Sequence, residues 1–259
     1  MKQFNSILYL FFRQASSDKM NLALTLLTTP FFILFYWLIF TSESSDANTV
    51  NNSSFENFIP GLLVFSMIMI VFSSAIAITS EKVNGTLLRI QMTGISESQI
   101  AFGFGLVQFS IAWIAFLLSL LVAYMVGFDK IWQDNSFLIF ASLNMICMIA
   151  IGIILGAISN SINRAFLIAS MVMFLLLLFS GIVFPKPNII FKVSILPNQE
   201  FYAFDILPTS LTISSFRKIL NANNTFIDLK YDLGFLFLQS IFYSTCSYIV
   251  FRFKSRSES

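Results

Sequence analysis

Six uninterrupted apolar stretches constrain this chain more than any other feature. They cover residues 22–40, 59–78, 100–126, 137–158, 166–184 and 233–251, and none contains Asp, Glu, Lys or Arg. A helix needs about 20 apolar residues to cross a hydrocarbon core of about 30 Å, whereas a barrel strand needs only about ten alternating ones. The sequence therefore predicts an all-α integral membrane protein with six transmembrane helices.

Composition excludes several classes of chemistry. Only 11% of the residues are charged and 57% are hydrophobic, whereas soluble domains keep about a quarter of their residues charged. The chain has no histidine, which removes imidazole bases and imidazole metal ligands, and we expect no metal site. Cys147 and Cys246 lie in apolar stretches, where a thiol acts as a small hydrophobe. No G-x-x-x-x-G-K-[ST] sequence is present, so we expect ATP to bind to another polypeptide.

The distribution of charge predicts the orientation. Six spans place both termini on one side, and residues 1–21, 79–99, 159–165 and 252–259 together hold nine Lys or Arg, against six in the other three connectors. Because cytoplasmic loops carry the excess of basic residues, we expect cytoplasmic termini. Low charge and abundant Phe, Ile, Asn and Ser suggest a bacterial cytoplasmic membrane. The first apolar stretch is too long for a signal peptide and is expected to stay attached.

The segment before the first span, residues 1–21, has a helical apolar stripe. The stripe comprises Phe4, Ile7, Leu8, Phe11, Phe12 and Ala15. Polar residues cover the other faces, and Lys2 and Lys19 flank the segment. We therefore expect a helix in the cytoplasmic interface, with its apolar face in lipid and its cations near head groups. The alternative is an extension of the first spanning helix.

The connector between the second and third spans, residues 79–99, is longer than a turn requires. It has 21 residues, whereas turns between neighbouring helices commonly need about 2–8. Asn84 and Gly85 can adopt the left-handed conformation that ends a helix. We therefore expect the second spanning helix to extend past the apolar stretch, through Glu81 and Lys82.

Local signals divide the rest of this connector. A short helix fits residues 86–92, and Thr93 with Gly94 interrupts it. Ser96 and Gln99 have the spacing of a capping box, which restarts a helix leading into the third span. The alternative is an ordinary turn, but the surplus length favours a docking surface.

The last outer connector, residues 185–232, is rich in aromatic and aliphatic residues. We expect it to be partly membrane-embedded or re-entrant, since these side chains would otherwise face water. A short amphipathic helix over 209–220 would turn Leu211, Ser215 and Phe216 toward the membrane and Arg217 and Lys218 toward water. The alternative is a soluble surface loop. Residues 233–251 then form the sixth span and 252–259 a cytoplasmic tail.

Small and polar residues inside the spans suggest packing surfaces. Gly152 and Gly156 form a G-x-x-x-G pattern, which lets helices approach closely either within one subunit or across a dimer seam. Gln108, Asn144 and Gln239 are the strongest polar groups in the spans, and we expect them to form hydrogen bonds between helices. The apolar stretches lack the ionisable residues of a proton relay.

Two parts of the cytoplasmic connector resemble a known family. The sequence EKVNGTLLRI at 81–90, followed by TGIS at 93–96, is similar to the E-x-x-x-G-T-L-x-R-L, T-P-x-S pattern of type-2 ATP-binding-cassette (ABC) transporter permeases. Ile90 stands where that family usually has leucine. Gly94 stands where proline is common.

Two outer segments extend the resemblance over essentially the whole chain. SGIVFP at 180–185 is similar to the S-G-x-x-F-P sequence that follows the fifth span in this family. Residues 207–217 are similar to its N-P segment that runs on to an arginine, with Leu207 in place of the asparagine. The resemblance implies one permease domain over 1–259, with spans one to five in 22–184.

The resemblance implies an exporter with two permease subunits and two separate ATPase subunits, which would bind ATP and Mg²⁺. Coupling to the ATPase would fall to Glu81, Gly85, Thr86, Leu87, Leu88, Arg89, Ile90 and Met92. The outer gate would include Ser180, Gly181, Phe184, Pro185, Pro208 and Arg217. The four apolar residues of the short helix would enter a groove on the ATPase. The arginine would offer a planar charged fork to carboxylates on that partner.

Two other functions stay open at this stage. An ion- or proton-coupled secondary transporter is the first alternative, although the apolar stretches lack charge. A membrane-embedded enzyme is the second, although the spans offer few acids, bases or nucleophiles. The expected partners are ATPase subunits, membrane lipid and a second permease, which is either a copy or a similar chain, and no nucleic acid. The substrate does not follow from the sequence.

Overall fold

The computed structural model describes residues 2–42, 51–128, 136–182, 193–196, 199–201, 203–222 and 229–257. Its helices are α1 (Lys2–Ser17), α2 (Lys19–Ser42), α3 (Asn51–Val83), α4 (Thr86–Met92), α5 (Glu97–Met125), α6 (Phe137–Ile158), α7 (Ile162–Phe179), α8 (Pro208–Ala222) and α9 (Lys230–Ser257). A 3-10 helix, η3 (Ala203–Ile206), precedes α8. The described strands, β1 (Val193–Leu196) and β2 (Gln199–Phe201), pair as an antiparallel hairpin.

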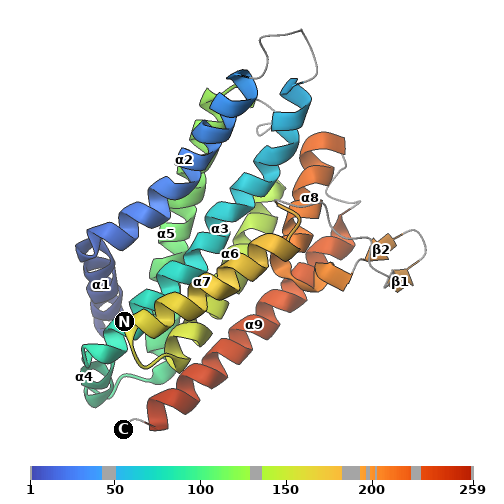
Figure 1. Ribbon diagram of the computed structural model, residues 1–259. Helices are drawn as coiled ribbons and strands as arrows, with labels where there is room; N and C mark the ends of the chain where they lie inside the picture. Colours follow the sequence, from blue (N-terminus) through green and yellow to red (C-terminus); the bar gives the residue numbers. More distant parts are fainter. Residues whose placement is uncertain are drawn as a thin grey trace.

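Six long helices form one bundle, which confirms the all-α membrane fold. Helices α2, α3, α5, α6, α7 and α9 are each long and apolar enough to cross a bilayer. Figure 1 shows α4 and both chain termini at one end of this bundle, here named the α4 end. Helix α8 and the β1–β2 hairpin lie at the opposite end, the α8 end.

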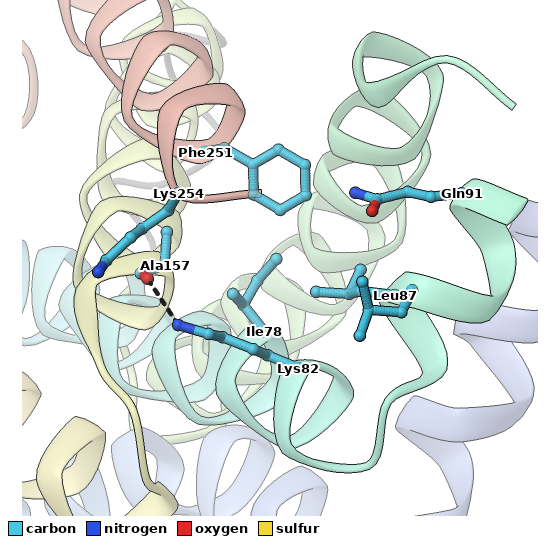
Figure 2. A pocket seen from close by; sticks show the side chains of 8 residues that line it. Ile78, Lys82, Leu87, Gln91, Ala157, Phe251 and Lys254 are labelled. Carbon is cyan, nitrogen blue, oxygen red and sulfur yellow. Dashed lines mark hydrogen bonds between the residues drawn. The ribbon is translucent and has the colours of Figure 1, made fainter. Parts of the chain in front are cut away.

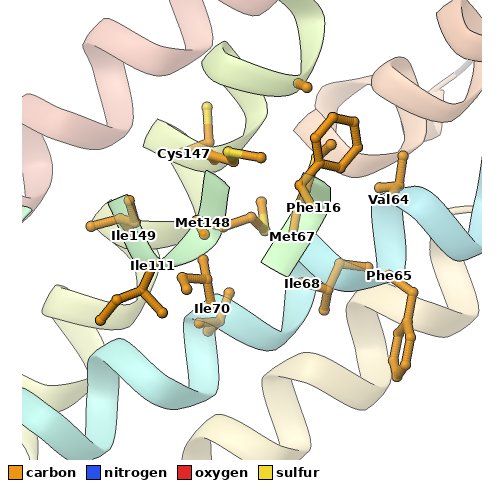
Figure 3. Close-up of a cluster of buried hydrophobic side chains, with 14 of the residues drawn as sticks. Val64, Phe65, Met67, Ile68, Ile70, Ile111, Phe116, Cys147, Met148 and Ile149 are labelled. Carbon is orange, nitrogen blue, oxygen red and sulfur yellow. The ribbon is translucent and has the colours of Figure 1, made fainter. Parts of the chain in front are cut away.

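Helix α3 is the centre of the bundle. In its most apolar window 78% of the residues are buried, against 17% in the corresponding windows of α2 and α7. Figure 3 shows Ile70 of α3 beside Ile111 of α5 and Met148 of α6. All three side chains are nearly inaccessible. In a bilayer, packing of this kind stabilises helix association through van der Waals contact rather than through exclusion of water.

Helices α6 and α3 approach each other closely in this core at two glycines of α6. A Cβ atom on Gly152 would lie 2.6 Å from Ser74 Cβ and 2.8 Å from the Val71 carbonyl oxygen. A Cβ atom on Gly156 would lie 2.7 Å from the Ala75 carbonyl oxygen. Both glycines therefore pack against a helix of the same chain, which is the first of the two alternatives that the sequence left open.

Helix α7 is displaced by four or five residues from the predicted span 166–184. It begins earlier because Ser161 caps it, accepting a hydrogen bond from the Arg164 backbone N–H at 3.3 Å. It ends earlier because Gly181 takes a φ of 82°, a left-handed conformation that stops a helix. The helix therefore ends before Gly181, although the sequence stays apolar through Ile182.

Helix α1 is separate from the first spanning helix, and it packs against the bundle. Asp18 divides the two helices, and its Oδ1 accepts a hydrogen bond from the Asn21 backbone N–H at 3.2 Å. Ile7 and Phe11 are buried, and the Phe11 ring meets Phe104 of α5 edge-on at 5.7 Å. The expectation that the whole apolar stripe faces lipid is therefore wrong for these two side chains, because α5 covers them.

Helix α8 is inserted among the spanning helices at the α8 end. It packs against α3 and α6, and the Phe216 ring meets Phe137 edge-on at 5.8 Å. Leu211, Ser215 and Phe216 are fully buried and face the bundle. The prediction that they face the surrounding membrane is therefore wrong. Lys218 is exposed on the opposite side and donates to Asp232 Oδ2 at 2.7 Å.

Candidate functional site

The connector at the α4 end has the division that the sequence predicts. Gly85, with a φ of 69°, separates α3 from α4 and occupies the N-cap position of α4. Gly94, with a φ of 79°, follows α4. The Ser96 backbone N–H donates to Gln99 Oε1 at 3.4 Å, which is the glutamine half of the expected capping box. The short helix thus stands between two left-handed glycines.

The residues of α4 divide between an inward and an outward face. Leu87 and Ile90 are buried in the hydrophobic core of the chain itself. Leu88 and Arg89 are exposed, and Met92 is 85% exposed. Leu87 and Ile90 are therefore not available to a partner, contrary to the expectation that all four apolar residues enter a groove elsewhere. The outward face retains two apolar side chains and one cation.

A small pocket of about 40 Å³ lies behind α4. Figure 2 shows Leu87 and Gln91 projecting from α4 toward Ile78 of α3 and Phe251 of α9. The inward face of α4 thus packs against the end of α3 and lies across this pocket from the end of α9.

Lys82 fixes the end of α3 to the end of α6. Its Nζ donates to the carbonyl oxygen of Ala157 at 3.3 Å (Figure 2). It also donates to the Ser159 carbonyl oxygen at 3.2 Å and lies 3.5 Å from Asn160 Oδ1. The last carbonyls of a helix have no partner within the helix and carry partial negative charge, so a lysine there is stabilising. The sequence placed Lys82 in the helix extension but gave no sign of this contact.

Glu81 joins three elements at the same end of the bundle. Its side chain is 3% exposed and accepts hydrogen bonds from the side chains of Gln14 in α1 and Thr86 in α4. The carboxylate itself belongs to α3. One buried group therefore connects the N-terminal helix, the central span and the short helix. The role of Gln14 was not expected, because it lies on a polar face of α1 and is remote in sequence.

Two of the predicted gate residues, Gly181 and Arg217, meet at the α8 end. Ser180 is buried and ends α7, and Gly181 follows it. Arg217 of α8 donates from Nη2 to the Gly181 carbonyl oxygen at 3.0 Å. Pro208 is the first residue of α8, where its missing N–H costs nothing. Phe184 and Pro185 lie outside the described residues.

Comparisons with known proteins identify the family of this chain. The model of the ABC-2 type transporter family matches residues 2–221. The chain is 30% identical over 178 residues to ABC transporter G family member 20 of Dictyostelium discoideum. That alignment covers 65% of this chain and 23% of the relative, so the chain spans less than a quarter of the relative's length. The chain therefore belongs to the ABC-2 type transporter family and is the membrane-spanning part of an ABC transporter.

Proposed function

We propose that this chain is the transmembrane subunit of an ATP-driven exporter, with separate ATPase subunits docked at the α4 end. Two permease chains would enclose the substrate path, and the partner subunits would bind ATP and Mg²⁺. The α4 end would face the cytoplasm, because the connectors that carry the excess of Lys and Arg lie there. A bacterial cytoplasmic membrane suits this arrangement.

The outward face of α4 is the observation that carries the proposal. Leu88 is 38% exposed and Met92 is 85% exposed, although both are apolar. Arg89 lies between them in sequence and is also exposed. An apolar pair beside a planar cation suits a groove with an acidic rim on a partner protein.

The contacts behind α4 give such a docking surface a mechanical connection to the spans. Leu87 and Ile90 anchor the helix in the core, and Thr86 reaches the Glu81 carboxylate. Lys82 then holds the end of α3 to the last carbonyls of α6. A displacement imposed on α4 by a partner would therefore move α3 and α6 together, because the three helices are joined by close packing and direct hydrogen bonds.

The sides of the bundle leave room for lipid and for a second permease. Helices α2 and α7 have the least buried apolar windows, together with α9 at 22%. Leu167 and Met171 of α7 are 67% and 68% exposed. Such apolar faces suit either lipid tails or another copy of a membrane helix. A homodimer and a pair with a similar permease both fit.

Docking is tested by charge reversal at each end of the bundle. Arg89→Glu should reduce the ATPase activity that co-purifies with the chain at least tenfold, and efflux should fall with it. Lys230→Glu, an exposed cation at the start of α9, is the matched control and should leave both unchanged. Membrane levels of both variants should equal the wild type. Normal efflux from Arg89→Glu would remove α4 from the mechanism.

The source of energy is tested in inverted vesicles. Transport should continue when an uncoupler collapses the proton gradient and ATP is maintained, and it should stop when ATP is withdrawn. Transport that stops with the gradient while ATP is unaffected would favour an ion- or proton-coupled secondary transporter instead.

A further inference from the structure

A second, more polar cavity lies at the α4 end and has no part in the docking surface. It has a volume of about 50 Å³ and is enclosed by α1, α2, α3 and α5. Its polar lining residues are Gln14, Asp18, Asn21, Ser73, Ser80, Glu81 and Gln108. A water occupies about 10–15 Å³ on this scale, so the space accepts a few small particles and no organic ligand.

Three residues that line this cavity each carry a buried oxygen atom without a partner. Asn21 Oδ1, Glu81 Oε2 and Gln108 Oε1 are each inaccessible and accept no hydrogen bond from any described residue. The side chains of Glu81 and Gln108 are only 3% and 2% exposed. Buried polar atoms are nearly always satisfied, because an unmet one costs about 1–3 kcal/mol and more when it is charged. Three of them around one small space indicate an occupant.

The charge around the cavity shows what kind of occupant is needed. All three unpartnered atoms are acceptors, and one belongs to a carboxylate. The described lining includes no Lys or Arg. Of the cations adjacent to it in sequence, Lys82 is turned toward the end of α6, and Arg13 and Lys19 are exposed. A buried carboxylate without a counter-charge is strongly unfavourable. Burial alone raises the pKa of Glu81 and favours its neutral form. An occupant that brings positive charge to the acceptors would satisfy all three atoms and keep Glu81 ionised.

We propose that this cavity binds a monovalent metal cation, Na⁺ or K⁺, through Glu81 Oε2, Gln108 Oε1 and Asn21 Oδ1. Carboxylate and amide oxygens are hard ligands of the kind that such ions prefer, and waters in the remaining space would complete the shell. One buried carboxylate balances one positive charge. Asp18 also borders the cavity, but it is exposed and its Oδ1 already accepts from the Asn21 backbone N–H.

The cation would hold together the elements on which coupling depends. Asn21 lies at the start of α2 beside the α1 junction, Gln108 lies on α5, and Glu81 lies at the end of α3. A bound ion would hold the start of α2, the end of α3 and α5 together beside α1, which also lines the cavity. This inference does not rest on the proposed function, since it concerns a site within one chain.

Thermal unfolding of the purified chain in detergent tests the proposal. The melting temperature should be higher in NaCl or KCl than in choline chloride of equal ionic strength, by about 3 °C or more, and the rise should saturate. Gln108→Leu and Asn21→Ala should lose this increment. Gln239→Leu is the matched control, because this buried span glutamine bonds to the Asp205 and Ile206 carbonyls instead and should retain the increment.

Each outcome of this experiment either supports the cation site or overturns it. Equal melting temperatures in all three salts would overturn the proposal and assign the cavity to water or to a proton on Glu81. An increment that survives in both site variants would place any cation elsewhere and would also overturn it. If Gln108→Leu fails to accumulate, Asn21→Ala decides, since Asn21 is only half-buried. Radioactive sodium or rubidium retained by the immobilised chain should follow the same pattern.

Discussion

Arg217 Nη2 lies 3.0 Å from the carbonyl oxygen of Gly181, and this contact joins α8 to the end of α7. The two residues belong to separate motifs, and the fold brings the motifs together. Gly181 is in a left-handed turn, so its carbonyl is directed away from the α7 hydrogen-bond ladder. Arg217 thus supplies the donor that the backbone lacks at this point.

Removing the Arg217 guanidinium should destabilise the α8 end. Arg217→Met keeps most of the side-chain volume but leaves the Gly181 carbonyl unpaired, which should cost about 1–3 kcal/mol. Thermal unfolding can be followed with a thiol-reactive dye, because Cys147 is buried and becomes reactive on unfolding. The control is Arg252→Met, which removes an exposed ion pair to Glu97 at 3.7 Å and should cost less than about 1 kcal/mol. Equal losses would contradict the assignment.

The two glycine environments in α5 and α6 predict opposite effects of the same substitution. Gly152→Ala places a Cβ 2.6 Å from Ser74 Cβ, so α6 must move away from α3, at about 1–3 kcal/mol. Gly105→Ala on α5 meets nothing within 4 Å and should leave the free energy of unfolding unchanged or raise it by up to about 1 kcal/mol. Similar melting temperatures for the two variants would argue against the close α3–α6 contact.

Strong local signals were predicted well from the sequence. Residues 86–92 form the expected helix because Gly85 and Gly94 stop the chain on either side, and such glycine conformations are decided within a few residues. The six spans are evident because length and the absence of charge are properties of contiguous residues. The fifth span was misplaced because the Ser161 cap lies beyond the apolar stretch that marked it.

Contacts between distant residues were not predictable. The hydrogen bond from Gln14 to Glu81 depends on how α1 crosses the end of α3. The apolar periodicity of each helix shows which of its faces is buried, but it does not show where the two helices cross. The inward face of α4 was missed for the same reason. Leu87 and Leu88 look alike in sequence, and only the position of α9 and α3 decides which one is buried.

Labelling of single cysteines tests the orientation. In a background with Cys147→Ala and Cys246→Ser, a cysteine at position 84 should react only after the membrane is permeabilised. A cysteine at position 223 should react with an impermeant reagent in intact cells. The expectation follows from the excess of Lys and Arg in the connectors at the α4 end. Labelling of position 84 in intact cells would reverse the proposed topology.

Glu81 and Gln14 should be energetically coupled. Gln14→Ala, Glu81→Gln and the double variant form a cycle, and the coupling free energy should be about 0.5–3 kcal/mol, as for residues in direct contact. Unfolding should be measured in choline chloride, so that cation binding does not contribute. A control cycle pairs Gln14 with Gln239, which bonds to η3 near the α8 end. That pair should be additive within about 0.5 kcal/mol, and equal coupling in both cycles would exclude a specific contact.

The junction at Gly85 gives the sharpest test of how α4 is connected to α3. Gly85 has a φ of 69° and open space around its Cβ position, so a side chain there is opposed by backbone conformation and not by crowding. Gly85→Val should cost about 1–2 kcal/mol, because a β-branched residue resists the left-handed region. Asparagine tolerates that region, so Gly85→Asn should cost much less.

Both variants should be compared with the wild type for membrane level, substrate-stimulated ATPase activity and efflux. We expect Gly85→Val to reduce ATPase stimulation and efflux at normal abundance and Gly85→Asn to preserve them. Equal activity of the two variants would mean that the left-handed junction is not needed for coupling, and poor insertion of Gly85→Val would assign the junction to folding instead.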